Sequence, residues 1–131
     1  MLASLGDAAL DDPAFAFEPK YDGIRALVSL DPRGGEHRVA IHSRLGNEKS
    51  AQFPDLVRAV DLQTKTLTRA LLLDGEIVAL DMAGQPTSFT RLQSRLHVTD
   101  RHLAEARSAE QPAAFVAFDL LRDGDDDLRD L

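Results

Sequence analysis

The stretch K-Y-D-G-I-R, Lys20 to Arg25, is the most informative part of the sequence. An apolar run that ends at Phe17 precedes it, followed by Glu18, and a segment of alternating apolar and polar residues follows it. This arrangement predicts a lysine held in a loop between two strands, where the amine has reach while the scaffold fixes its direction. Gly23 allows a tight backbone turn just after the lysine. Lysines act as covalent nucleophiles where burial or nearby positive charge activates the amine, so Lys20 is the candidate catalytic residue.

A hairpin is predicted directly after this stretch. Apolar and polar side chains alternate from Gly23 to Leu30, which is typical of a half-buried strand. A turn at residues 31–35 leads to a returning strand at Arg38 to Ser43, so residues 23–43 form the predicted hairpin. The glycine pair Gly34-Gly35 belongs to this turn, because no G-x-x-x-x-G-K pattern follows that would indicate a phosphate-binding loop.

The rest of the chain alternates between predicted strands and helices. The expected elements are a short strand at Ala14–Glu18, a helix at Phe53–Leu62, an apolar strand at Leu71–Asp81, a helix at Ser88–Leu96 capped by Ser88, a weaker helix at His102–Ser108 and a last strand at Ala113–Leu121. Strands joined mostly by hairpins and helices predict an α+β fold, in which antiparallel sheets have flanking helices.

Two of the predicted strands carry polar or aromatic residues at informative positions. Asp74 and Glu76 are two apart on an apolar strand, so both carboxylates are expected on one face, where they need polar partners or a ligand. Phe118 and Asp119 are adjacent on the last strand and are expected on opposite faces. Phe118 is therefore predicted to face a ligand while Asp119 has a structural role.

Composition limits the classes of function. The 131 residues suffice for one domain or part of one, and the absence of cysteine excludes disulfides and thiolate metal sites. Neither a secretory signal nor an apolar run long enough to cross a membrane is evident, which predicts a soluble intracellular protein. The 22 acidic residues exceed the 15 basic ones, so this segment is not expected to bind DNA strongly by itself. A local basic face around Arg25, Arg44, Lys49 and Arg91 is compatible with the net charge of −7.

Two other groups of residues do not predict a metal site. The four histidines, His37, His42, His97 and His102, lack the spacing of a zinc-binding set. The acidic run at residues 123–127 lacks the spacing of a calcium loop and is expected to be a solvated turn.

Four ordered motifs carry a resemblance to a known family. K-Y-D-G-I-R resembles the first motif of the covalent nucleotidyltransferases, which comprise ATP-dependent DNA ligases, RNA ligases and mRNA capping enzymes. S-R-L-G at residues 43–46, with F-P-D-L at 53–56, resembles a stretch found in DNA ligases. L-D-G-E at 73–76 and F-V-A-F-D-L-L at 115–121 resemble the two motifs that follow. The sequence is most similar to bacterial ATP-dependent DNA ligases of the end-joining type.

The resemblance implies a fold and a reaction. The fold would be that of the ligase adenylation domain, a nucleotidyltransferase domain resembling the ATP-grasp fold, here truncated. Lys20 would attack the α-phosphate of ATP, with Mg²⁺ present, and form a lysyl-AMP intermediate. The AMP would then pass to a DNA 5′-phosphate during sealing of nicked or broken double-stranded DNA. The resemblance also implies a bacterial cytoplasmic protein associated with the nucleoid.

The same resemblance implies roles for five further residues. Glu18 would meet the edge of the adenine, and Phe118 would stack on its ring. Arg25 and Arg44 would contact the ribose or a phosphate of the nucleotide or nick, with the division between them open. Glu76 would bind a ribose hydroxyl or help to hold the metal.

Several expectations remain open at this point. The E-G motif, the lysine motif and the oligonucleotide-binding (OB) domain that follow in the family have no match here, so residues 1–131 are expected to be a partial adenylation domain. A larger polypeptide or a partner would supply the missing motifs. The alternatives are a noncatalytic nucleotide-binding remnant or interaction module, and an RNA ligase or capping-type enzyme. The S-R-x-G…F-P-x-L stretch favours DNA ligase over the last two.

Overall fold

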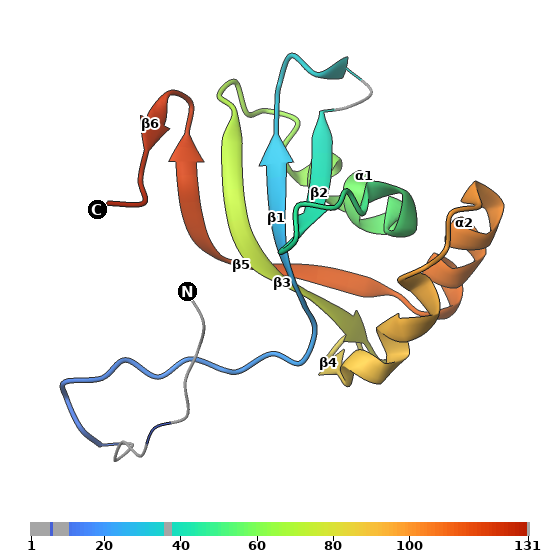
Figure 1. Ribbon diagram of the computed structural model, residues 1–131, viewed down its shortest axis with the longest axis horizontal. Coiled ribbons are helices and arrows are strands. Elements are labelled where there is room, and N and C mark those ends of the chain that lie inside the picture. Colours follow the sequence, from blue (N-terminus) through green and yellow to red (C-terminus); the bar gives the residue numbers. More distant parts are fainter. Residues whose placement is uncertain (1–5, 7–10, 36–37, 131) are drawn as a thin grey trace.

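The computed structural model describes residue 6, residues 11–35 and residues 38–130 (Figure 1). Its strands are β1 (Ile24–Leu30), β2 (Val39–Ser43), β3 (Leu71–Leu80), β4 (Pro86–Thr87), β5 (Ala113–Asp123) and β6 (Asp126–Asp127). Its helices are η2 (Ser50–Gln52), α1 (Pro54–Gln63), η3 (Phe89–Arg95) and α2 (Arg101–Glu110), where η denotes a 3₁₀ helix. The strands form one antiparallel sheet in the order β2-β1-β3-β5-β6, with β4 paired to β3.

This architecture confirms the predicted α+β class and most of the predicted elements. The hairpin at residues 23–43 is the β1–β2 pair. The expected helix at Phe53–Leu62 is α1, and the last strand extends two residues beyond its predicted end, to Asp123. The predicted helix at residues 88–96 is the 3₁₀ helix η3, whose cap is Ser88: its hydroxyl oxygen accepts a hydrogen bond from the backbone N–H of Thr90.

The predicted strand at Ala14–Glu18 is wrong. Residues 14–18 lie in no strand, and Phe15 and Phe17 remain 56% and 49% exposed. The segment before β1 runs away from the sheet (Figure 1). Its hydrogen bonds are local: Asp12 accepts from the backbone N–H groups of Ala14 and Phe15. A short apolar run indicates a strand only where a neighbouring strand pairs with it, and sequence periodicity does not report on that partner.

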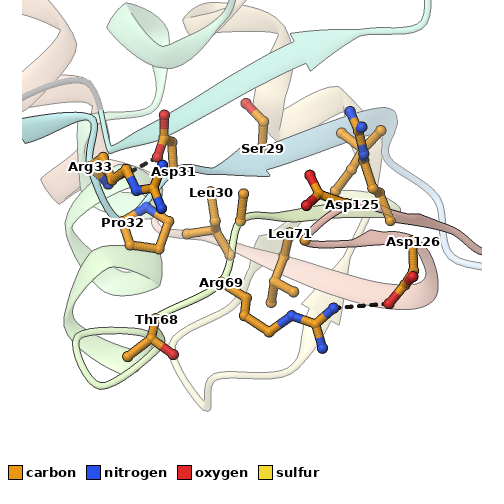
Figure 2. Close-up of a pocket in the computed structure, with 14 residues that line it drawn as sticks. Ser29, Leu30, Asp31, Pro32, Arg33, Thr68, Arg69, Leu71, Asp125 and Asp126 are labelled. Carbon is orange, nitrogen blue, oxygen red and sulfur yellow. Dashed lines mark hydrogen bonds and ion pairs between the residues drawn. The ribbon is translucent and has the colours of Figure 1, made fainter.

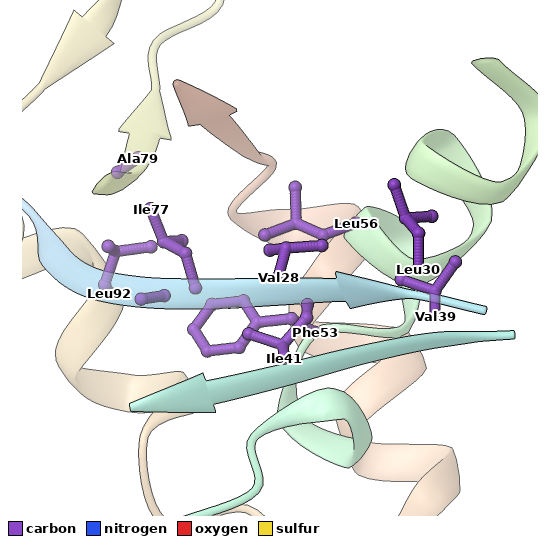
Figure 3. Packing of buried hydrophobic residues seen from close by; sticks show 10 residues of the cluster. Val28, Leu30, Val39, Ile41, Phe53, Leu56, Ile77, Ala79 and Leu92 are labelled. Carbon is purple, nitrogen blue, oxygen red and sulfur yellow. The ribbon is translucent and has the colours of Figure 1, made fainter. Parts of the chain in front are cut away.

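The core lies on one face of the sheet, beneath the helices. Side chains of β1, β2 and β3 that point to this face meet Phe53, Leu56 and Leu92 from the helical side (Figure 3). The alternation predicted for β1 holds, because Ala26, Val28 and Leu30 are at most 2% exposed. The other face of the same strands is consequently left for polar and aromatic residues.

A buried arginine ties the helices to one another. Arg95, at the end of η3, is fully buried and forms a bidentate ion pair with Asp55 in the first turn of α1. Ser108 of α2 completes the group: its hydroxyl oxygen accepts from Arg95 at 2.8 Å and donates to Asp55 at 3.1 Å. Each of the three helices thus contributes one member of this network.

Backbone and aromatic groups complete the environment of Arg95. The carbonyl oxygens of Gln52 and Gln111 accept hydrogen bonds from its guanidinium at 3.1 and 2.9 Å. The guanidinium also lies 4.5 Å from the centre of the Phe53 ring. A buried charge requires such compensation, because its removal from water is otherwise very costly.

We expect Asp55→Ala to destabilise the fold strongly, because it leaves the charge of Arg95 buried without its counter-ion. The loss in the free energy of unfolding should be about 3 kcal/mol or more, measured by chemical denaturation. Glu105→Ala is the matched control, since it removes a carboxylate from the exposed Arg58–Glu105 pair on the same helices. Equal small losses in both variants would contradict the importance given to the Arg95 network.

Candidate functional site

The face of the sheet away from the helices carries a cluster of charged side chains. In the β1–β3 ladder Arg25 is opposite Glu76, and Leu27 is opposite Asp74. Directly opposed residues in an antiparallel pair share a face, so Asp74 and Glu76 lie together on the face that carries Arg25. This confirms the prediction that both carboxylates point to one side of the strand.

Arg25 is held between an acid and an aromatic ring. Its Nε and Nη2 donate to the two carboxylate oxygens of Asp74 at 2.6 and 2.7 Å, a bidentate arrangement. Its guanidinium carbon lies 4.5 Å from the centre of the Phe118 ring. The hydrogen bonds that Arg25 donates to Asp74 raise the pKa of Arg25 above its ordinary value. The charges of Asp74, Glu76 and Asp119 act in the same direction, whereas desolvation by burial opposes the shift.

The strand β5 contains an irregularity at Phe118. Ala117 is opposite Gly75 and Asp119 is opposite Asp74, so Phe118 is one extra residue in the ladder. Asp119 therefore shares the face of Asp74 and lies close enough to influence the pKa of Arg25. The prediction that Asp119 points to the opposite face from Phe118 is wrong, because the bulge interrupts the two-residue alternation.

Glu76 and Gly23 are coupled through the start of β1. Partial burial raises the pKa of the Glu76 carboxyl, while Arg25 and a hydrogen bond from the Gly23 backbone oppose this shift. A side chain at position 23 would overlap the carbonyl oxygen of Ile77, so this position requires glycine. The preceding residue of the motif, Asp22, is also fixed, because its carboxylate accepts a hydrogen bond from the Phe89 backbone N–H at 3.0 Å.

A hollow of about 570 Å³ lies beside this cluster, at the start of β1. It brings together three of the predicted site residues: Arg25, Arg44 and Glu76. Lys49 and His97 also line it, although the sequence did not single them out as site residues. The sequence placed Lys49 in a predicted basic face, which was its only signal. It gave no signal for His97, because the four histidines lack the spacing of a zinc site.

Lys20 and Glu18 are the predicted site residues that the structure does not join to the cluster. Both are exposed and lie in the segment before β1. Lys20 is three residues before Gly23, so its backbone lies within roughly 11 Å of the hollow's edge even if the chain is extended. Asp22, missed as a site residue because Asp-Gly is so often a simple turn, anchors this segment to η3.

A second hollow, of about 730 Å³, lies at the other end of β1 and contains none of the predicted site residues (Figure 2). Arg69, one of the arginines that line it, pairs with Asp126 at 2.9 Å. Among the described residues, no group of three or more histidine, aspartate or glutamate side chains is arranged to hold a metal ion. In the same part of the chain, no helix is both long and apolar enough to cross a bilayer.

Known proteins are similar to this chain in sequence and in fold. DNA ligase C2 of Mycolicibacterium smegmatis is 41% identical over 116 residues, which cover 88% of this chain and 30% of that protein. DNA ligase C of Mycobacterium tuberculosis is 36% identical over 118 residues, covering 88% of this chain and 29% of that protein. The crystal structure of the ligase domain of M. tuberculosis LigD superposes with a TM-score of 0.57 at 31% identity, covering 85% of this chain and 30% of that one.

A family model described as the ATP dependent DNA ligase domain matches residues 1–131. The chain spans less than a third of the length of the ligases named above. The match extends over the whole chain, and the fold superposes on that of a solved ligase domain. The chain therefore belongs to the ATP-dependent DNA ligase domain family.

Proposed function

We propose that this chain is part of the adenylation domain of a DNA ligase that uses ATP. In the first step the Nζ of Lys20 bonds to the α-phosphorus of ATP, the bond to pyrophosphate breaks, and the amine loses a proton to solvent. The AMP then passes from Lys20 to a DNA 5′-phosphate, and attack by the adjacent 3′-hydroxyl seals the strand and releases AMP. The observation that carries this proposal is the assembly of Arg25, Glu76 and Phe118 on one face of the sheet, whose strand β1 follows the motif lysine directly in the chain.

Phe118 offers an aromatic face for the adenine. It is 43% exposed, which is unusual for a large apolar residue in a sheet and suits a stacking platform. The guanidinium of Arg25 lies on this ring in the structure, so the base either uses the other face or displaces the arginine. We assign Glu18, in the exposed segment before Lys20, to the edge of the same base.

The two arginines differ in what already neutralises them. Arg25 donates two hydrogen bonds to the Asp74 carboxylate, which neutralises its charge. It therefore suits a contact with the uncharged ribose. Arg44 forms no ion pair within the part of the chain that the structure describes, and it suits a phosphate. This assigns Arg25 to the nucleoside side of the site and Arg44 to the phosphate side.

Glu76 is the residue that we propose binds a ribose hydroxyl or Mg²⁺. A magnesium ion usually retains waters and takes one or two carboxylates together with substrate phosphates, so a single carboxylate at the edge of the hollow fits it. When bound, the ion would neutralise the developing charge on the phosphates. The relative described as mycobacterial DNA ligase D complexed with ATP and MES, 32% identical to this chain, supports the assignment of ATP.

The rest of the ligation machinery is proposed to lie outside residues 1–131. This chain covers only 29–30% of the matched ligases, so a larger polypeptide or a partner would supply the OB-fold, the later motifs and most of the DNA affinity. The lysines of those motifs would neutralise the α-phosphate and promote attack by Lys20. Nicked or broken double-stranded DNA as substrate would place the protein at the nucleoid in the bacterial cytoplasm.

A second candidate is a noncatalytic module that binds a nucleotide reversibly. The observation favouring it is that Lys20 is exposed in a segment outside the sheet, whereas Arg25, Glu76 and Phe118 are held by the sheet. An RNA ligase or capping-type reaction is the remaining alternative within enzymes. Parallel assays with GTP separate the capping reaction from the ATP-dependent ones.

We expect Lys20→Ala to abolish covalent labelling by ATP carrying a radioactive α-phosphate in the presence of Mg²⁺. The wild-type adduct should be labile to acid, as a phosphoramidate is, and GTP should give none. Lys65→Ala is the matched control, since Lys65 is an exposed lysine on the loop after α1. Label that persists in Lys20→Ala would refute the assigned nucleophile, and a folded wild-type chain without label would favour the noncatalytic module.

Phe118→Ala should weaken reversible ATP binding by roughly tenfold, because stacking of a base on an aromatic ring is worth about 1–3 kcal/mol. Phe118→Trp should retain most of the affinity. Leu62→Ala serves as the control, because Leu62 is an exposed apolar residue on the helical side. Isothermal titration calorimetry provides the measurement, and equal affinities for wild type and Phe118→Ala would exclude the stacking role.

The affinity for ATP should fall at acidic pH because of Glu76. Burial raises the pKa of this carboxyl, so it takes up a proton at a higher pH than an ordinary glutamate. Binding that uses the ionised form is complete above the raised pKa and is lost as the pH falls through it. Titrations across roughly pH 4–8 should show this loss in wild type and in Glu105→Gln, but not in Glu76→Gln. The same pH profile in Glu76→Gln would rule out Glu76 as the titrating group.

A further inference from the structure

The hollow at the start of β1 is locally positive in an acidic chain. Arg25, Arg44 and Lys49 line it, against the single carboxylate of Glu76. Asp74 already neutralises Arg25. The unbalanced positive charge therefore comes from Arg44 and Lys49, neither of which forms an ion pair with any other residue that the structure describes.

Lys49 is placed by its backbone rather than by a charged partner. Its N–H donates to the carbonyl of Ile41 at 2.7 Å, and the next residue, Ser50, accepts from the Ile41 N–H at 3.0 Å. The side chain then crosses towards η3, where its Nζ donates to the carbonyl of Leu96 at 3.4 Å. An ammonium group has three donors, so two remain for a ligand in the hollow.

A second wall of the hollow is equally well defined. Arg44 follows β2 in a tight turn closed by hydrogen bonds between Ser43 and Asn47 at 2.9 Å and between Gly46 and Ser43 at 2.8 Å. Gly46 has a φ of +80°, which other residues rarely adopt. The Ser43 hydroxyl oxygen is buried and has no hydrogen-bond partner among the described residues. This wall thus adds an unused hydroxyl to the charge of Arg44.

We infer that Lys49 is a further phosphate-binding residue, which holds a phosphate group in this hollow together with Arg44. Two cations that line one hollow, each on a fixed backbone and without an ion-pair partner among the described residues, suit a doubly charged phosphate better than any neutral ligand. The phosphate belongs either to the pyrophosphate part of ATP or to the 5′ end of DNA. The identity of the molecule that carries the phosphate, ATP or DNA, rests on the proposed function. The phosphate site itself does not.

The test uses inorganic pyrophosphate, and nicked duplexes with either a 5′-phosphate or a 5′-hydroxyl at the nick. Lys49→Ala should bind the phosphate-bearing probe about tenfold more weakly, as expected for loss of a hydrogen bond to a charged group. Lys49→Met keeps the aliphatic stem and should show the same loss, which separates charge from packing. Lys65→Ala removes the same charge elsewhere and should bind within about twofold of wild type.

The pattern of losses identifies the carrier. A loss confined to pyrophosphate assigns Lys49 to ATP, whereas a loss confined to the 5′-phosphorylated nick, absent with the 5′-hydroxyl nick, assigns it to the DNA end. Either pattern supports the inference. Two results would overturn it. One is that Lys49→Met and Lys65→Ala have the same affinity for every probe, and the other is that the wild-type chain binds none of the phosphate probes.

The covalent labelling assay distinguishes this inference from the proposed function. If wild type forms no adduct at Lys20 but loses pyrophosphate affinity on Lys49→Met, the proposed reaction fails while the phosphate site stands. If wild type is labelled normally and Lys49→Met binds the phosphate probes as wild type does, only the role of Lys49 is refuted.

Discussion

The buried ion pair between Arg95 and Asp55 is the constraint on which the arrangement of this molecule depends. A guanidinium that is wholly removed from water must keep its partners, so α1, η3 and α2 are held in one relative position. That position covers the apolar face of β1, β2 and β3 with one helical layer. It also sets the place of η3: its first residue, Phe89, contacts Asp22 of the motif stretch, and Leu96, directly after its end, contacts Lys49 at the hollow.

The division of the sheet into two faces explains where the chemistry lies. β3 runs through the middle of the sheet and turns Ile77 and Ala79 to the helices, while Asp74 and Glu76 point to the other side. Carboxylates on so apolar a strand require compensation, and Arg25 supplies it from the neighbouring strand. The same arginine meets Phe118 from β5, so three adjacent strands contribute to one small surface. The acidic composition of the chain is compatible with a phosphate ligand because two cations without an ion-pair partner among the described residues, Arg44 and Lys49, line one hollow.

Much of the secondary structure could be predicted, since it follows from local patterns. The alternation in β1, the Pro54 start of α1 and the Ser88 cap of η3 each depend on neighbouring residues alone. The strand expected at residues 14–18 failed because a strand exists only with a partner. The orientation of Asp119 failed because the bulge at Phe118 depends on pairing with β3, and no local signal marks it. The Arg95 network was also missed, because a lone arginine in sequence resembles a surface residue.

The sequence by itself determined the family, the order of the motifs and the identity of the candidate nucleophile, because these depend on residue types at short spacings. It also determined that Asp74 and Glu76 share a face, which follows from the two-residue period of a strand. Only the tertiary structure decided that Arg25 lies between Asp74 and Phe118, and that Lys49, Arg44, Arg25 and Glu76 line one hollow. Those contacts join residues far apart in the chain, and they arise from strand pairing and from the packing of η3, which no local pattern encodes.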